Sequence, residues 1–210
     1  MIVIKEEYKE ILDALKETML ADAIDFNQND IPDLMSELKS KYTKRKLSYD
    51  NGASKFVLFL QGLPFVVKIS FTSDEWGDEL AESNYCGIEE RVYTAAKEEG
   101  MQDFFAGIEC IGVVGQHDIY VQELAIVLRA SEIPVTVPMN SVGQAVTLMR
   151  KNSCSISSDW GGTVIDFFGA KRFIDFLTFV KRQEIDDLHD GNVGYIGSRP
   201  VLLDYSGYFG

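Results

Sequence analysis

The sequence has few cysteines and no long apolar run. Its three cysteines, Cys86, Cys110 and Cys154, are odd in number and far apart, which excludes a disulfide framework and a clustered zinc site. No apolar run approaches the roughly 20 residues that a membrane-spanning helix needs, and the N-terminal stretch MIVIKEEYKE becomes charged after four residues. We therefore expect a cytoplasmic protein with reduced thiols and no membrane partner.

Basic residues are also scarce. Lys and Arg number 20 against 33 Asp and Glu, which gives a formal net charge of −13. A chain this acidic lacks the broad positive field that attracts nucleic acid or anionic lipid. We expect no nucleic-acid partner, and an anionic ligand must be held by a few local cations or by a metal.

Apolar residues, by contrast, are abundant enough for a folded core. They make up 46% of the 210 residues, which suits one large domain or two small lobes. Helical spacing dominates up to about residue 46, and the segment IPDLMSELKSKY begins with Pro32 after Asp30, as helices often do. Its basic tail, KSKYTKRK, is either a solvated helix end or linker, or a site for an anion or a partner.

The middle of the sequence carries strand patterns. The β-branched and aromatic runs KFVLFL and LPFVVKIS, separated by Gln61 and Gly62, predict a hairpin. The segment GIEERVYTAAKEEG predicts a helix that ends at Gly100. Two further apolar segments, FFAGIECIGVVG and DIYVQELAIVL, predict a strand pair that turns at GQHD. The predicted order is strand, strand, helix, strand, strand.

The last third predicts helices followed by a short hairpin. The two prolines of SEIPVTVPMN predict a linker, and AVTLMRK and AKRFIDFLTFVKRQEI predict helices. The second helix leads into DLHDGNVGYIGSRPVLLDY, which places Asp187 and Asn192 before the hairpin and Asp204 after it.

These segments resemble the protein-kinase-like superfamily, especially its aminoglycoside-phosphotransferase-like branch. DLHDGN resembles the catalytic loop, VLLDYSG the metal-binding segment and FVVKI the strand with the phosphate-pairing lysine. The resemblance covers roughly Leu47 to the C-terminus. It implies an α+β, two-lobed fold with an antiparallel-sheet N-lobe at residues 47–128 and a reduced, mainly helical C-lobe at 129–210, after an N-terminal helical extension at 1–46.

The resemblance also implies ATP as nucleotide and Mg²⁺ or Mn²⁺ as metal. Lys68 would contact the α/β-phosphates, and Asp187 would orient an acceptor hydroxyl and take its proton. Carboxylate and amide oxygens are ligands that suit Mg²⁺, so Asp204 and Asn192 would bind the metal. The implied nucleotide contacts are Gly52 and Ser54 in the phosphate loop, Val66 over the adenine, Gln122 behind it, and the backbone from Glu123 to Ala125.

Several assignments have an alternative. Helical spacing favours Glu89 over Glu90 as the partner of Lys68, because Glu89 shares the face of Val92 and Ala96. The alternative interpretation of Lys68 is an edge-strand lysine that discourages aggregation. The alternative interpretation of DLHDGN is an ordinary turn, because Asp, Asn and Gly are common turn formers.

The sequence departs from the family pattern at several points. Ile185 and Asp186 precede Asp187 where His-Arg or His-Gly is usual, Asp190 replaces a proline, and the phosphate loop has one glycine where the protein-kinase pattern has three. The sequence also ends six residues after Asp204, before the helices that normally bind the acceptor. We expect a phosphotransferase that acts on a hydroxyl of a protein or small molecule; the alternative is a weak or inactive pseudokinase that serves as a nucleotide-binding interaction module.

The missing helices lead to an expectation about partners. The predicted helix at 170–185 has an apolar face formed by Phe173, Phe176, Leu177 and Val180. We expect this face of the short C-lobe to need cover from the segment VTLMRK with its neighbours, from the N-terminal helices, from a second copy in a homodimer, or from another protein.

Overall fold

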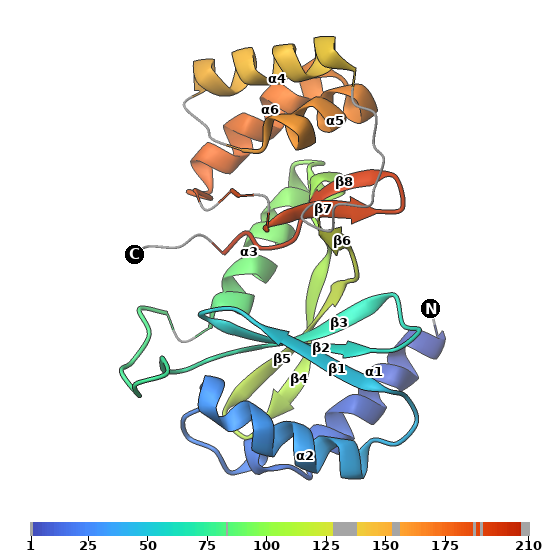
Figure 1. The fold of residues 1–210 in the computed structure, drawn as a ribbon, viewed down its shortest axis with the longest axis vertical. Helices are drawn as coiled ribbons and strands as arrows, with labels where there is room; N and C mark the ends of the chain where they lie inside the picture. Colours follow the sequence, from blue (N-terminus) through green and yellow to red (C-terminus); the bar gives the residue numbers. More distant parts are fainter. Residues whose placement is uncertain are drawn as a thin grey trace. The chain divides into compact units, whose positions relative to one another are not determined.

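The computed structural model describes residues 2–82, 84–127, 138–152, 156–186, 188–189 and 191–206. The chain divides into two compact units, one of Met1–Glu90 with Ile108–Glu123 and one of Arg91–Gly107 with Leu124–Gly210. Helices and an antiparallel five-stranded sheet (Figure 1) confirm the predicted α+β class. The three segments expected from the sequence stay a prediction about domain boundaries. None of the described helices has the length and apolar character of a membrane span.

The sheet of the first unit contains both predicted strand pairs and one strand that was not predicted. Its spatial order is β1-β2-β3-β5-β4, and each neighbouring pair is antiparallel. Helix α3 (Tyr85–Glu98) lies between β3 and β4 in sequence, as expected. The unpredicted strand is β1, which begins where the basic tail ends. The strands are β1 (Leu47–Asn51), β2 (Lys55–Leu60), β3 (Phe65–Ser70), β4 (Ile108–Val114) and β5 (His117–Glu123).

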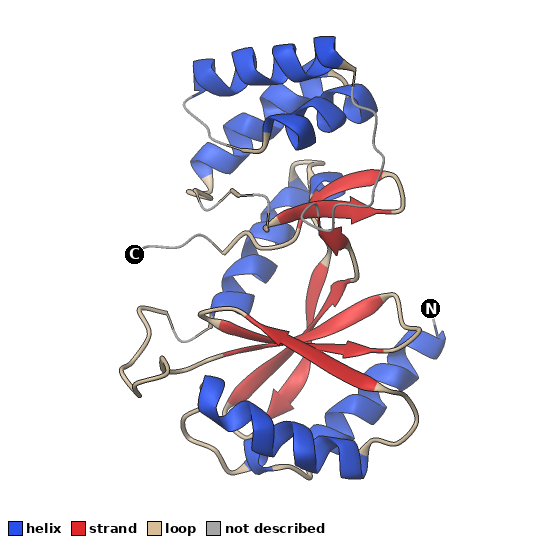
Figure 2. Ribbon diagram, in the orientation of Figure 1, coloured by secondary structure: helices blue, strands red, loops and turns tan. Residues whose placement is uncertain are grey.

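The N-terminal helices cover one face of this sheet (Figure 2). Helices α1 (Ile2–Leu15) and α2 (Ile31–Lys41) are joined through the short 3₁₀ turns η1 (Met19–Ala21) and η2 (Gln28–Asp30). Their apolar side chains form one buried cluster with alternate residues of β2 and β3. Burial of each such side chain contributes about 1.5–3 kcal/mol. The helical extension is therefore part of the core of the first unit.

The basic tail after α2 has a structural role. Arg45 donates to the Glu7 carboxylate, with Nε 3.2 Å from Oε2, and Lys44 pairs with Glu10. These ion pairs tie the connection between α2 and β1 to helix α1. Lys44 and Arg45 therefore have acidic partners within the first unit, as the linker interpretation would have it.

Strand β3 lies inside the sheet, between β2 and β5. The interpretation of Lys68 as an edge-strand lysine is therefore wrong. Side chains alternate along a strand: Phe65, Val67 and Ile69 join the core beneath the helices, whereas Lys68 and Ser70 contact residues of the segment that begins α3. This alternation places a charged side chain on the face that α3 covers.

The second unit contains the later part of α3, the helices α4, α5 and α6, and a small antiparallel sheet of order β6-β7-β8. Two of the helices, α4 and α6, were predicted, but α5 was not. Its segment SDWGGTVIDFF contains two glycines, which disfavour a helix. A Cβ at Gly161 would lie 3.2 Å from side-chain atoms of Ala145 and Phe173, so this glycine lets the three helices pack closely. The elements are η3 (Gln102–Phe104), β6 (Ile126–Val127), α4 (Met139–Asn152), α5 (Ser158–Phe168), α6 (Ala170–Arg182), β7 (Val193–Ile196) and β8 (Arg199–Leu202).

The apolar face of α6 is covered within its own unit. Phe173, Phe176, Leu177 and Val180 are all buried. The Phe176 ring lies 4.7 Å from that of Phe104 in η3 and 5.7 Å from that of Trp160 in α5, measured between centroids. η3 and α5, the helix that follows the VTLMRK segment, therefore cover this face within its own unit. The possible homodimer or protein partner stays a prediction.

Candidate functional site

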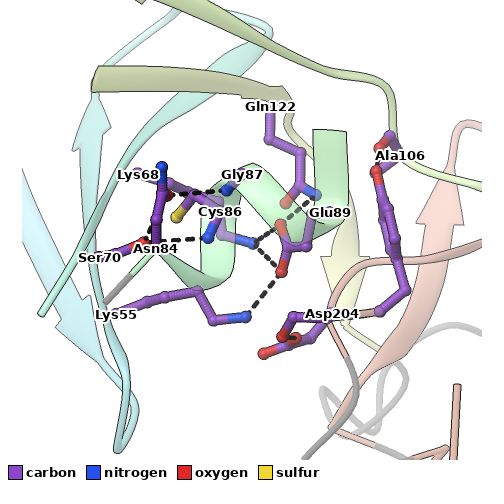
Figure 3. Close-up of polar contacts among 12 residues, drawn as sticks. Lys55, Lys68, Ser70, Asn84, Cys86, Gly87, Glu89, Ala106, Gln122 and Asp204 are labelled. Atoms are coloured by element: carbon purple, nitrogen blue, oxygen red, sulfur yellow. Dashed lines mark hydrogen bonds and ion pairs between the residues drawn. The ribbon is translucent and has the colours of Figure 1, made fainter. Parts of the chain in front are cut away.

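Glu89 of α3 is the centre of a buried charged cluster in the first unit (Figure 3). Lys68 Nζ donates to both carboxylate oxygens, at 3.0 Å to Oε1 and 2.7 Å to Oε2. Lys55 Nζ donates to Oε1 at 2.7 Å, and Gln122 Nε2 donates to Oε2 at 3.4 Å. The Glu89 side chain is 0% exposed, and the two lysine side chains are 5% and 6% exposed. One carboxylate from α3 thus receives donors from β2, β3 and β5.

A buried cluster of charges lowers the stability of the fold if it has only a structural role. Each charged group that leaves water loses several kcal/mol of solvation, and well-packed apolar residues often serve a core as well or better. Buried charge clusters of this kind are commonly found at functional sites. Ammonium groups that a carboxylate holds in place are also oriented donors, and such donors suit the oxygens of a phosphate. The cluster is therefore a candidate anion-binding site.

Glu90, the alternative partner of Lys68, lies elsewhere. Its Oε1 accepts a hydrogen bond from Cys110 N of β4 at 2.8 Å, in an exposed position. Adjacent helical residues differ by about 100° in direction, so Glu89 and Glu90 do not reach the same neighbours. The structure pairs Lys68 with Glu89.

Sequence reasoning missed Lys55. In the β2–β3 hairpin Val57 lies across from Lys68 and Lys55 across from Ser70. Residues two apart on a strand share a face, so Lys55 is a diagonal neighbour of Lys68 on the α3 side of the sheet. The predicted hairpin already contained this signal. Once the turn is located, the numbers of paired residues have a constant sum, so Lys55 can be assigned to the same face of the sheet as Lys68.

Asn84 fixes the start of α3. Its Oδ1 accepts a hydrogen bond from Gly87 N at 2.8 Å, which is the capping contact of a helix N-terminus. Its Nδ2 donates to Asp118 Oδ2 at 2.8 Å and to the Tyr120 hydroxyl at 3.0 Å, both on β5. A Cβ at Gly87 would lie 2.8 Å from Asn84 Nδ2, so glycine leaves room for this side chain. The cap sets the position of Glu89, which follows in the first turns of the helix.

Cys86 lies in the first turn of α3 beside the charged cluster and is fully buried. Its backbone N donates to Ser70 Oγ at 3.0 Å. Burial, together with the nearby Glu89 charge, raises the pKa of the Cys86 thiol from 9.0 to about 11, although Lys68 and Lys55 act in the opposite direction. The thiol is therefore protonated at neutral pH and does not serve as a nucleophile there.

Asn192 and Asp204 flank the β7–β8 hairpin of the second unit. Leu203 N donates to Asn192 O at 2.8 Å, which extends the strand pairing by one position and brings the two flanking segments side by side. Ser206 Oγ donates to Asp204 Oδ1 at 3.1 Å. An amide oxygen and a carboxylate are hard oxygen ligands, so this pair fits Mg²⁺ or Mn²⁺ chemically.

The other predicted site residues occupy varied positions. Gly52 lies in the β1–β2 turn, where its N donates to Lys55 O at 3.0 Å, and Ser54 O accepts from Phe71 N at 2.9 Å. A phosphate contact by the Gly52 N–H would require that turn bond to break. Val66 is buried on β3, Glu123 ends β5, and Ala125 lies between β5 and β6. Asp187 and Asp190 lie outside the described residues.

Comparison with known proteins gives little further information. No family model matches the sequence, and no curated protein matches it. One similar solved structure is that of an aminoglycoside phosphotransferase in a ternary complex with streptomycin and ATP, with a TM-score of 0.36 and 9% identity over 82% of this chain and 69% of that chain. At this TM-score and identity, the likeness assigns no role to any residue of this chain.

Proposed function

We propose that this protein is an ATP-dependent phosphotransferase that moves the γ-phosphate to a hydroxyl of a protein or small molecule. The observation that carries the proposal is the buried Lys68–Glu89 ion pair, which joins a central strand to the helix that follows it. The sequence segments DLHDGN and LLDY support it, since they occur after the sheet and the helices in the order that the kinase-like resemblance implies.

Phosphoryl transfer depends mainly on positioning and on the neutralisation of charge. Lys68 would donate to the α/β-phosphates, and Glu89 would fix the direction of its ammonium group. Val66, Gln122 and the backbone of Glu123–Ala125 would contact the adenine, while Gly52 and Ser54 would lie near the phosphates. The acceptor oxygen would attack the γ-phosphorus as the bond to the β–γ bridging oxygen breaks, and ADP would leave.

The remaining roles belong to Asp187, Asn192 and Asp204. Asn192 Oδ1 and the Asp204 carboxylate would hold Mg²⁺ or Mn²⁺, which supplies positive charge for the phosphates when bound. Asp187 would orient the acceptor hydroxyl and take its proton. Asp204 also accepts a hydrogen bond from Ser206 Oγ, which restrains the carboxylate.

Thermal melting with nucleotide tests the donor side. A ligand at a hundred times its dissociation constant stabilises the folded state by about 2.7 kcal/mol, which for a chain of this size corresponds to a shift of about 5 to 10 °C. We expect this shift with ATP and Mg²⁺ together, no shift for Asp204→Ala and a reduced shift for Lys68→Ala. Lys97→Ala, which removes a lysine from the far end of α3, is the matched control. A wild-type protein without a shift at saturating Mg·ATP would contradict the proposal.

Transfer itself separates an enzyme from a nucleotide-binding interaction module. Single-turnover incubation with γ-labelled ATP, with the protein alone and with a cell lysate, should yield labelled product. Binding of Mg·ATP without any transfer, including release of labelled phosphate to water, would favour the module.

A further inference from the structure

Lys55 is the one member of the cluster to which the kinase-like resemblance gives no role. It is the first residue of β2, and its side chain points to the α3 side of the sheet instead of into solvent. The contact with Glu89 Oε1, at 2.7 Å, is shorter than the contact of Lys68 with the same oxygen, at 3.0 Å. Lys55 and Lys68 therefore share one acceptor atom.

The Glu89 carboxylate accepts hydrogen bonds from Lys55, Lys68 and Gln122. Oε1 receives Lys55 and Lys68, whereas Oε2 receives Lys68 and Gln122. Lys68 bridges the two oxygens, and Lys55 and Gln122 each hold one of them. If Lys68 turned toward another acceptor, each carboxylate oxygen would still keep one hydrogen bond.

This arrangement matters for the proposed contact between Lys68 and phosphate. An ammonium group has three N–H donors in tetrahedral directions, and a contact with phosphate oxygens redirects at least one of them. Unless the carboxylate were held independently, its position would change along with that of Lys68. Lys55 supplies such a hold from a neighbouring strand, and it adds a second positive charge on the same face of the sheet.

We propose that Lys55 is a positioning residue for nucleotide binding. It fixes Oε1 of Glu89, so that the carboxylate keeps Lys68 directed at the phosphates while Lys68 exchanges part of its contact with Glu89 for a contact with phosphate. This role rests on the proposed function. It concerns the phosphates of the nucleotide, and the contribution of the nucleoside to binding does not depend on it.

The test compares the affinities for Mg·ATP and for adenosine in five proteins: wild type, Lys55→Met, Lys55→Arg, Lys68→Met and the double variant Lys55→Met/Lys68→Met. Methionine keeps most of the apolar stem and removes the charge, and arginine keeps the charge and the donors. Without this hold on Glu89, Lys68 is less well directed at the phosphates, so Lys55→Met should weaken ATP binding about tenfold or more. Adenosine affinity should stay the same, and Lys55→Arg should restore most of the ATP affinity.

The double variant decides how Lys55 acts. Because Lys55 works through Glu89 and Lys68, its removal should have little further effect on ATP affinity once Lys68 is methionine. Full additivity of the two losses would mean that Lys55 contacts phosphate itself, and the positioning role would be overturned. A lower melting temperature with unchanged ATP affinity would assign Lys55 a structural role only and would also overturn it.

Failure of the proposed function can be distinguished from failure of the role of Lys55 alone. A wild-type protein that binds adenosine and ATP equally well, or neither, would refute the proposed function and the role of Lys55 together. If Lys55→Met does not fold, Lys55→Gln replaces it in both backgrounds, since glutamine removes the charge and replaces the charge-assisted hydrogen bond to Oε1 by a weaker neutral one at most. The expected order of ATP affinities is then wild type, Lys55→Gln, Lys68→Met, and an order with Lys55→Gln equal to wild type would contradict the proposal.

Discussion

Replacement of Glu89 by glutamine is the sharpest perturbation that the structure suggests. The change keeps the size of the side chain and removes the negative charge that two buried ammonium groups contact. Removal of one partner from a buried ion pair costs about 3–5 kcal/mol. Here a single substitution affects two such pairs, so we expect a loss of at least about 4 kcal/mol in the free energy of unfolding.

In the wild type the Glu89 carboxylate offsets the repulsion between the two lysines, and this compensation is lost with its charge. The distances of 2.7 and 3.0 Å to the shared Oε1 limit the separation of the two Nζ atoms to 5.7 Å. At an effective dielectric constant of about 20, two unit charges at that separation repel each other by about 3 kcal/mol. A domain is typically stable by only about 5–15 kcal/mol. Glu89→Gln should therefore be marginally folded.

Urea denaturation followed by circular dichroism measures the loss, and Glu90→Gln is the matched control. Glu90 is the next residue of the same helix and makes one exposed hydrogen bond, to Cys110 N, so its replacement should cost less than about 1 kcal/mol. Adding Lys55→Met to Glu89→Gln removes one of the two ammonium groups and should recover stability. Equal effects of the two glutamate substitutions, or a further loss in the combined variant, would refute the reasoning.

Three more predictions follow from particular contacts. Because the pKa of the Cys86 thiol is raised from 9.0 to about 11, the unfolded chain releases this proton first. Stability should therefore fall by about 3 kcal/mol as the pH rises from about 9 to 11, and the urea midpoints at about pH 8 and about pH 10.5 should differ less in Cys86→Ala than in the wild type. A Cβ at Gly115 would lie 2.5 Å from Ala21 O, whereas Gly100 has a similar positive φ and open space around it. Gly100→Ala should lower the free energy of unfolding by roughly 1–2 kcal/mol, and Gly115→Ala should lower it by more, as measured by thermal melting. Asp187→Asn should leave ATP affinity nearly unchanged and reduce the transfer rate by about 10² or more, and an unchanged rate would leave Asp187 only a role in the turn.

Local periodicity explains what could be predicted from the sequence. Alternation along FVVKIS separates Lys68 from Val67 and Ile69, and the structure buries the two apolar residues in the core with α1 and α2. Helical spacing favoured Glu89 over Glu90, and Glu89 is the residue that Lys68 contacts. Both inferences depend only on residues within a few positions of one another, for which the geometry of a strand or a helix is enough.

The unpredicted helix α5 shows where this reasoning fails. Its two glycines lower the local preference for a helix, but Gly161 fits closely against Ala145 and Phe173. Tertiary packing therefore overrides local propensity. The same packing covers Phe176 with Phe104 and Trp160, so the apolar face of α6 is buried in its own unit.

The sequence by itself determined the α+β class, the order of the main elements and the presence of a lysine in an apolar strand. Only the tertiary structure decided that this strand is central in the sheet and that Lys55 shares the carboxylate of Glu89. Lys55 and Glu89 are 34 positions apart, and their contact depends on the hairpin register and on the docking of α3. The hairpin register follows from the turn, but the docking of α3 is set by packing between distant segments, and no local pattern of the sequence specifies it.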